Sequence, residues 1–225
     1  MQGLEIFAMK GAEYVFCGAF LLVLVAFWRL LNTPAPSRTV ARALPPRRGW
    51  FDVPDGFYFH QGHGWVLPED PRVMRVGIDD FAQKLLGRVS GFELPAVGAR
   101  VAQGEPAWHI RLDGHEIPML SPVDGEVIDV NPQVAASPEL VNADPYQRGW
   151  LLKVKVRNPN AAARNLLSGG LARGWMDGIV ENLRGMRAAE LGVVLPDGGF
   201  PVDGFARALS PERWDDVART FLLSD

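Results

Sequence analysis

The sequence predicts a mainly β domain, preceded by one transmembrane helix and followed by a helical C-terminal extension. An apolar run precedes short segments in which apolar residues alternate with polar ones, and apolar residues at helical spacing come last. We therefore expect five parts: an extracytoplasmic segment (1–13), a transmembrane helix (14–31), a proline-rich linker (32–50), a β domain (51–157) and a helical extension (158–225).

The first of these features is the apolar run YVFCGAFLLVLVAFWRLL, in which only Arg29 is charged. Its length just reaches the lower limit for crossing the apolar core of a bilayer, about 30 Å. Tyr14 and Trp28 fit the aromatic belt at a membrane interface, and Arg29 can extend its charge to the headgroups. Gly18 and Ala19 offer a small-residue face for close helix packing. We expect a membrane anchor with the lipid bilayer as one partner.

A cleaved signal peptide is the alternative interpretation of this run. A signal peptide has a basic start and a small-residue cleavage site, whereas Glu5, Lys10 and Glu13 make this start mixed in charge. An uncleaved anchor is therefore favoured. Positive charge is concentrated after the run, on the side that stays in the cytoplasm. We expect a single-pass protein of the cytoplasmic (inner) membrane, with the N-terminus outside and the C-terminal domain in the cytoplasm.

Within residues 51–157, two segments alternate in the manner of half-buried strands: Val73–Ile78 and Trp150–Val156. A short helix is expected over Asp80–Leu86, where Phe81, Leu85 and Leu86 fall on one face. These patterns indicate β structure that is interrupted by at least one helix.

Residues 158–225 have a different character. A helix is expected to begin at Asn158 and run to about Leu171, and a second is expected over Trp175–Leu191. Ser210 and Pro211 have the pattern of an N-cap and a first-turn proline, so they predict the start of a third helix.

The middle of the chain resembles the H-protein of the glycine cleavage system. The resemblance is carried by five motifs in the family's order and spacing: HGWV at 63–66, VGIDDFAQKLLG at 76–87, ELPAVGARVAQGEP at 93–106, SPVDGEVIDVN at 121–131 and PELVNADPYQRGWLLKVKV at 138–156. The fold that the resemblance implies is the lipoyl-domain type, a flattened barrel-sandwich of two small sheets.

In that family, a hairpin presents a lysine in an E-S-V-K pattern, and this lysine carries lipoate, which shuttles an aminomethyl group between partner enzymes. The flanking GEP and SP motifs align this pattern with Arg111, Leu112, Asp113 and Gly114, so glycine stands at the lipoyl position. No lysine lies between Lys84 and Lys153. Asp-Gly is a favoured two-residue hairpin turn, so the hairpin is expected to persist without its cargo.

Other kinds of chemistry have weak support in the sequence. A net charge of −3 argues against nucleic-acid binding. The histidines and paired acids lack a metal-ligand or catalytic pattern, so we predict no enzyme, metal or cofactor. Aromatic residues are favoured interface anchors, and four are candidate partner contacts: Trp108, Trp175, Trp214 and Phe221.

Three functions fit these features. The favoured one is a non-catalytic structural or assembly subunit of a bacterial energy-converting membrane complex, photosynthetic or respiratory, in contact with its other subunits. The layout is similar to that of the H subunit of purple bacterial photosynthetic reaction centres, an analogy of architecture only. The alternatives are an accessory protein that docks to lipoate-dependent or glycine-cleavage enzymes, and a stand-alone membrane-tethered binding module.

Overall fold

The computed structural model describes residues 17–25, 27–28, 49–184 and 201–224. Two units are distinguished, Met1–Leu44 and Pro45–Asp225. In the first unit, residues 17–25 and 27–28 are helical, and their side chains are exposed. No helix within the described ranges is long and apolar enough to cross a membrane. The expected transmembrane helix over 14–31 is therefore not found, and its ends, including Tyr14 and Arg29, lie outside the described residues.

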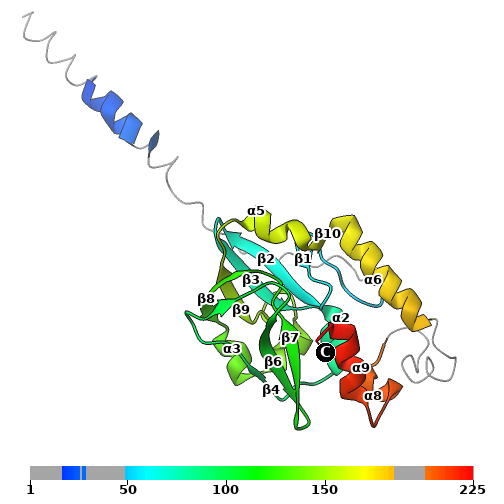
Figure 1. Ribbon diagram of the computed structural model, residues 1–225. Coiled ribbons are helices and arrows are strands. Elements are labelled where there is room, and N and C mark those ends of the chain that lie inside the picture. The colour runs from blue at the N-terminus through cyan, green and yellow to red at the C-terminus, as the bar shows by residue number, and fades with distance from the viewer. Residues whose placement is uncertain (1–16, 26, 29–48, 185–200, 225) are drawn as a thin grey trace, which may run out of the picture. The chain divides into compact units, whose positions relative to one another are not determined.

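The second unit contains two antiparallel sheets (Figure 1). The larger has the order β10-β1-β2-β3-β9-β8-β5, and the smaller has the order β4-β6-β7. The strands are β1 (Tyr58–Phe59), β2 (Gly64–Asp70), β3 (Val73–Ile78), β4 (Gly91–Glu93), β5 (Arg100–Val101), β6 (Pro106–Leu112), β7 (His115–Leu120), β8 (Gly125–Val130), β9 (Leu152–Lys155) and β10 (Leu167–Ser168).

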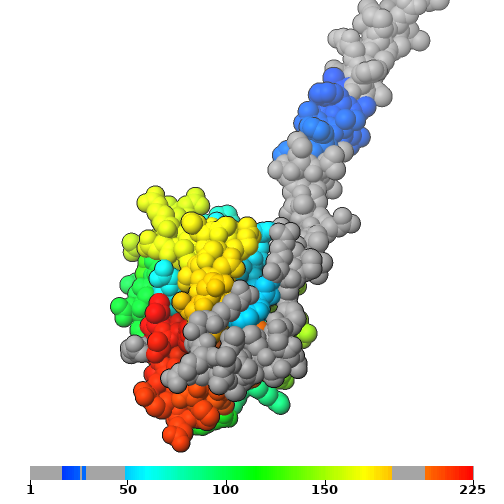
Figure 2. Space-filling view, turned by 90° about the vertical axis from the view of Figure 1, so that its right-hand side faces the viewer, coloured from blue at the N-terminus to red at the C-terminus, as the bar shows by residue number. Residues whose placement is uncertain are grey.

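Short helices connect and cover these sheets. They are α2 (Asp80–Leu86), α3 (Pro132–Ala136), α4 (Leu140–Ala143), α5 (Pro159–Ala162), the 3₁₀ turn η1 (Ala163–Asn165), α6 (Gly169–Arg184), α8 (Phe205–Leu209) and α9 (Trp214–Leu222). Figure 2 shows α6, in yellow, on the same face of this unit as α8 and α9, in orange and red. The mainly β fold that the sequence predicts is confirmed.

One pairing shows how strongly the sequence fixes the register of the larger sheet. Trp65 on β2 lies opposite Gly77 on β3, and a Cβ at Gly77 would lie 2.5 Å from the Trp65 ring. The indole Nε1 donates to the carbonyl of Ile78 at 2.8 Å. A side chain at position 77 would displace this fully buried ring, so the pair fixes the register.

Helix α2 has the bounds that the sequence predicts. Asp79 is its N-cap, and the carboxylate accepts from the backbone N–H of Ala82 at 2.8 Å. Phe81, Leu85 and Leu86 are fully buried in the main core. This short helix therefore forms because the Asp79 cap fixes its start and its apolar face packs in the core.

The C-terminal region differs from the expectation in three places. Leu167–Ser168 form strand β10, which pairs with β1, where a continuous helix to Leu171 was expected. The larger sheet thus extends past the expected domain boundary at residue 157. Ser210 ends α8 and does not cap a helix start, since α9 begins four residues later at Trp214. The second expected helix begins earlier, at Gly169, and residues 185–191 lie outside the described ranges.

The C-terminal helices bury apolar side chains in the same core as the sheets. Trp214, Ala218 and Leu222 recur every four residues and form the buried face of α9. Met176 and Leu183 do the same for α6. These helices are therefore part of the fold of the second unit.

Candidate functional site

The β6–β7 hairpin holds the position at which the resemblance places a carrier lysine. The strands pair in register from Trp108 opposite Met119 to Leu112 opposite His115. Asp113 and Gly114 alone connect the strands, with φ of 50° and 80°. Left-handed values at both positions are those of a type I′ turn, which matches the twist of the flanking strands. The predicted two-residue Asp-Gly turn is confirmed.

The tip of this hairpin is open to solvent. Asp113 and Gly114 are exposed, and a Cβ added at Gly114 would meet no atom within 4 Å. Space for a side chain is thus available, but an amide bond to lipoate requires a primary amine, and glycine has none. Arg111 cannot serve, because a guanidinium remains protonated.

Arg111 braces the hairpin on its exposed face. Its guanidinium lies 2.8 Å from the Glu93 carboxylate on β4 and 3.1 Å from that of Glu116 on β7. These hydrogen bonds, first to Glu116 and then to Glu93, raise the pKa of Arg111. All three side chains are about half exposed, so solvent screens the attraction. The two ion pairs of Arg111 therefore orient β4, β6 and β7 relative to one another but add little to the free energy of unfolding.

The C-terminal helices hold the hairpin from the other side. Arg207 of α8 donates to the Asp113 carboxylate at 2.5 Å and to the carbonyl of Leu86 at 2.9 Å. Its guanidinium lies 4.4 Å from the centre of the Trp214 ring. Arg207 therefore links the hairpin tip, the end of α2 and the start of α9.

Two further contacts join α9 to β7. His115 Nδ1 lies 3.2 Å from the Asp215 carboxylate, and its ring meets that of Trp214 edge-on, with centroids 5.0 Å apart. Arg219 donates to the carbonyl of Glu116 at 2.8 Å. Because Asp215 and Arg219 lie about one turn apart on α9, the helix lies alongside the first residues of β7. The turn residues are exposed, but Asp113 and the first residues of β7 are held by side chains of α8 and α9.

The four aromatic residues predicted as partner contacts lie in or against the core. Trp108 and Trp214 are buried, with 1% and 7% of their surface exposed. The Trp175 ring is tilted against the His63 ring, with centroids 4.8 Å apart, and the ring centroids of Phe221 and Phe81 are 5.4 Å apart. A buried indole has little surface to offer another subunit, so Trp108 and Trp214 are better understood as core residues.

A buried polar cluster lies at the start of α2. His63 Nδ1 is 2.8 Å from the Asp79 carboxylate, and both side chains are buried. Burial is the main reason why the pKa of Tyr146 is raised well above 10.0, and its hydroxyl donates to the carbonyl of Asp52. Since each member has a partner inside the protein, the cluster stabilises the junction of α2 with the sheet.

Comparisons with known proteins agree with this geometry. The family model described as glycine cleavage H-protein matches residues 57–176, which is more than half of the chain. The chain belongs to the glycine cleavage H-protein family. The match extends past residue 157 and includes β10 and the first half of α6, in agreement with the observed sheet.

Individual relatives are similar over the same region. A probable glycine cleavage system H protein 2 of Sulfurisphaera tokodaii is 40% identical over 124 residues, covering 54% of this chain and 83% of the relative. The glycine cleavage system H protein of Thermus thermophilus is 39% identical over 119 residues, covering 53% and 92%. The crystal structure of the Mycobacterium marinum H protein matches with a TM-score of 0.50 and 25% identity, covering 57% of this chain and 99% of that chain.

These relatives correct the expected function. A structural subunit of a photosynthetic or respiratory membrane complex is wrong, because the relatives are glycine cleavage system H proteins. The expected partners, a lipid bilayer and the other subunits of such a complex, are wrong for the same reason. The layout shared with reaction-centre H subunits rested on a spanning helix, and none is found among the described residues. An analogy of layout cannot outweigh a match in sequence.

The expected location in the inner membrane is contradicted by the relatives, which are glycine cleavage system H proteins. Gly18, Ala19 and Trp28 lie within the described helical residues 17–25 and 27–28 of the first unit. An apolar composition alone was therefore insufficient for the prediction.

Proposed function

We propose that this chain is a non-catalytic, non-lipoylated H-protein homologue that binds the enzymes acting on lipoylated H proteins. The observation that carries the proposal is the Asp113–Gly114 turn, which keeps the shape of the hairpin and lacks an amine at the carrier position. A protein with this surface and without the lipoyl arm can occupy a docking site but cannot transfer an aminomethyl group.

Three features support binding to these enzymes over a stand-alone role. Identity of about 40% to glycine cleavage H proteins extends over most of each relative. The hairpin tip is exposed, as a docking element must be. The braces from Arg111 and Arg207 hold the hairpin in one arrangement, which lowers the entropic cost of binding.

The test is a competition experiment. The glycine cleavage P, T and L proteins of the host are assayed with lipoylated H protein while increasing amounts of this chain are added. We expect competitive inhibition of at least one partner. Arg111→Gln should weaken this inhibition, because it removes two contacts that position the hairpin. The control is Arg100→Gln, which removes an equal charge from β5 on the other sheet.

The proposal fails if the chain neither binds nor inhibits any of the three proteins at concentrations well above that of the lipoylated competitor. It also fails if the chain replaces lipoylated H protein in the complete reaction, since that would require a carrier group. Inhibition that Arg111→Gln and Arg100→Gln reduce equally would assign the contact to another surface.

A further inference from the structure

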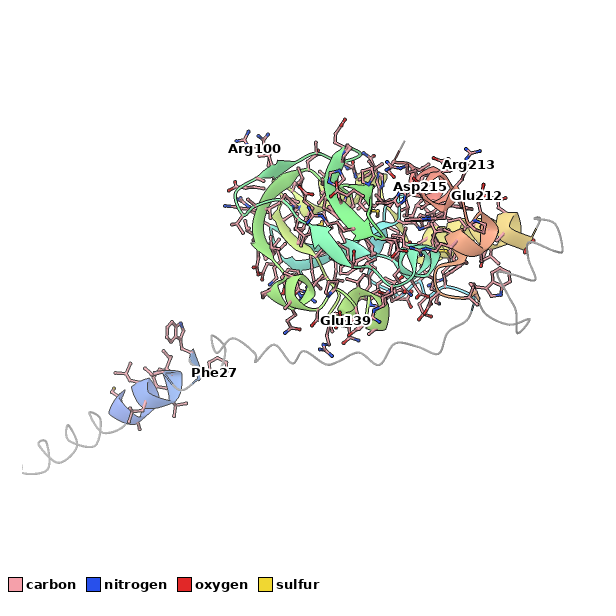
Figure 3. All side chains as sticks on the ribbon, turned by 90° about the horizontal axis from the view of Figure 1, so that it is seen from below. Phe27, Arg100, Glu139, Glu212, Arg213 and Asp215 are labelled. Carbon is pink, nitrogen blue, oxygen red and sulfur yellow. The ribbon has the colours of Figure 1, made fainter. Side chains whose placement is uncertain are left out.

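A pocket with cationic walls lies at the end of the larger sheet, away from the hairpin tip. It is open and has a volume of about 640 Å³. Its lining comes from β5, β8, the end of β9 and the segment that leads through α5 to η1. Figure 3 shows Arg100, one of the lining residues, far from Asp215 and Arg213, which lie at the start of α9. The pocket is thus separate from the site described above.

The strand register brings charged side chains into one row across the sheet. Arg100 on β5 lies opposite Glu126 on β8, and Glu126 lies opposite Lys155 on β9. Directly paired residues of adjacent strands point to the same face. The backbone N–H of Val156 donates to the carbonyl of Arg72 at 2.9 Å, which places Arg72 beside the end of β9. Sheet pairing therefore gathers these side chains from four separate segments.

Positive charge exceeds negative charge in this pocket. Arg72, Arg100, Lys155 and Arg157 line it together with Asp124 and Glu126, so four cations face two anions. Among the described residues, none of the four cations forms an ion pair, whereas Arg75 and Lys153 on the neighbouring part of the sheet both pair with Glu69. The Asp124 carboxylate already accepts from the backbone N–H of Gln103 at 2.9 Å. The cations are thus available to an external anion.

The remaining lining groups define the kind of ligand. Gln103, Asn158 and Asn165 supply amide groups, and Asn165 donates to the Gln103 side chain at 3.1 Å. The described lining residues include no aromatic ring on which a base could stack. A volume of this size falls within the range of roughly 300–1,000 Å³ that is usual for small-molecule sites. Cations and amides without a stacking surface suit compact ligands that carry several oxyanions.

We propose that this pocket binds a small, multiply charged anion of the phosphate type. Arg72, Arg100, Lys155 and Arg157 neutralise its charge, and the amides donate hydrogen bonds to its oxygens. Because all four cations are exposed, binding should weaken as salt increases. The proposal concerns a site on the larger sheet and does not depend on the function of the hairpin.

Isothermal titration of the full-length protein with inorganic pyrophosphate tests the proposal. We expect saturable binding with one ligand per chain. The double variant Arg100→Gln/Lys155→Gln removes two of four charge-assisted contacts and should weaken binding at least about tenfold. Lys155→Arg keeps the charge and should bind nearly as well as the natural chain. Arg213→Gln, which removes a cation at the distant start of α9, is the control and should leave binding unchanged.

Unchanged melting temperatures of all variants would show that the fold is retained, since the altered side chains are exposed. The proposal is overturned if pyrophosphate does not bind, or if it binds equally to the natural chain and the double variant. It is also overturned if vesicles that contain anionic phospholipid bind through these residues while free pyrophosphate does not. Equal loss of binding in Arg213→Gln would identify a nonspecific effect of net charge and would count against the site.

Discussion

Helix α9 is expected to contribute to the stability of the H-protein-like unit itself, and Leu222 offers the sharpest test. Leu222 is fully buried on the face that α9 shares with Trp214 and Ala218. Leu223 follows it directly and is 52% exposed. The two leucines therefore provide a matched pair, because replacement of either by alanine removes the same atoms from neighbouring positions.

Leu222→Ala should lower the free energy of unfolding by about 3 kcal/mol, within the range of about 2–5 kcal/mol for buried leucines. The lower part of this range is expected because the cavity lies near the C-terminus, where the chain can partly relax. For a unit of this size, each kcal/mol corresponds to about 2–4 °C in melting temperature, so we expect a decrease of about 6–12 °C. Leu223→Ala should change the free energy by less than about 0.5 kcal/mol.

Urea unfolding followed by tryptophan fluorescence measures both free energies, and an unchanged dependence on urea would show that the same surface unfolds. Equal effects of the two substitutions would refute the assignment of α9 to the core. In that case the helix would be a separate element, available for docking to another protein. A loss that is confined to Leu222→Ala would make the C-terminal helices part of the fold.

Three further predictions concern the sheets, the hairpin and the pH dependence of stability. Gly125→Ala should destabilise the protein by about 1–3 kcal/mol, because the added Cβ would lie 2.5 Å from the Lys155 carbonyl oxygen. The control is Gly91→Ala, where an added Cβ meets nothing within 4 Å. Equal melting temperatures of the two variants would contradict the register of β8. A double-mutant cycle of Arg207→Gln and Asp113→Asn should give a coupling of at most about 1 kcal/mol that decreases with salt, and no coupling at low salt would rule out the ion pair. Burial, and secondarily the charge of His63, lower the pKa of His60 from 6.5, so the folded chain binds this proton less readily than the unfolded chain does. The free energy of unfolding should therefore decrease as pH falls from about 6.5 through the lowered pKa. His60→Gln should make the free energy of unfolding less dependent on pH in this range.

Local signals predicted the elements whose causes are local. Asp79 caps α2 and Phe81 starts its apolar face, so both helix type and bounds followed from the sequence. The hairpin turn was equally predictable, because Asp113 and Gly114 both adopt left-handed conformations that favour this pair. Motifs on both sides of the hairpin place the expected carrier position at Gly114, and this assignment remains a prediction.

Contacts between distant segments were not predictable in this way. Strand β10 forms because Leu167 pairs with Phe59 on β1. The strand has only two residues, Leu167 and Ser168, which is too few to show the alternating pattern of a strand in the sequence. Gly204 is the N-cap of α8, and its N–H donates to the carbonyl of Lys84, a residue distant in the sequence, at 2.7 Å. Arg207 reaches Asp113 over 94 positions, so its role at the hairpin had no signal in its own neighbourhood.

The apolar N-terminal run was the most misleading pattern. Its composition satisfied the usual criteria for a spanning helix, and the orientation and the partner complex were inferred from it. No described helix meets the length requirement, and the relatives belong to a different functional class. The apolar run thus led to a prediction of membrane-complex assembly, and only the family membership of the chain could test that prediction.

The mass of the intact protein after incubation with a lipoylating enzyme shows whether this chain can carry lipoate. The chain is incubated with lipoate, ATP and a lipoate ligase, with the Thermus thermophilus H protein as a positive control and Gly114→Lys as a matched variant. We predict no lipoyl adduct on the natural chain, because no amine stands at the hairpin tip, whereas the positive control should be modified. Gly114→Lys meets no atom within 4 Å at its Cβ, and although the φ of 80° at this position strains any side chain, the variant should gain an adduct. A lipoyl adduct on the natural chain, at any lysine, would show that the chain is a lipoate carrier after all.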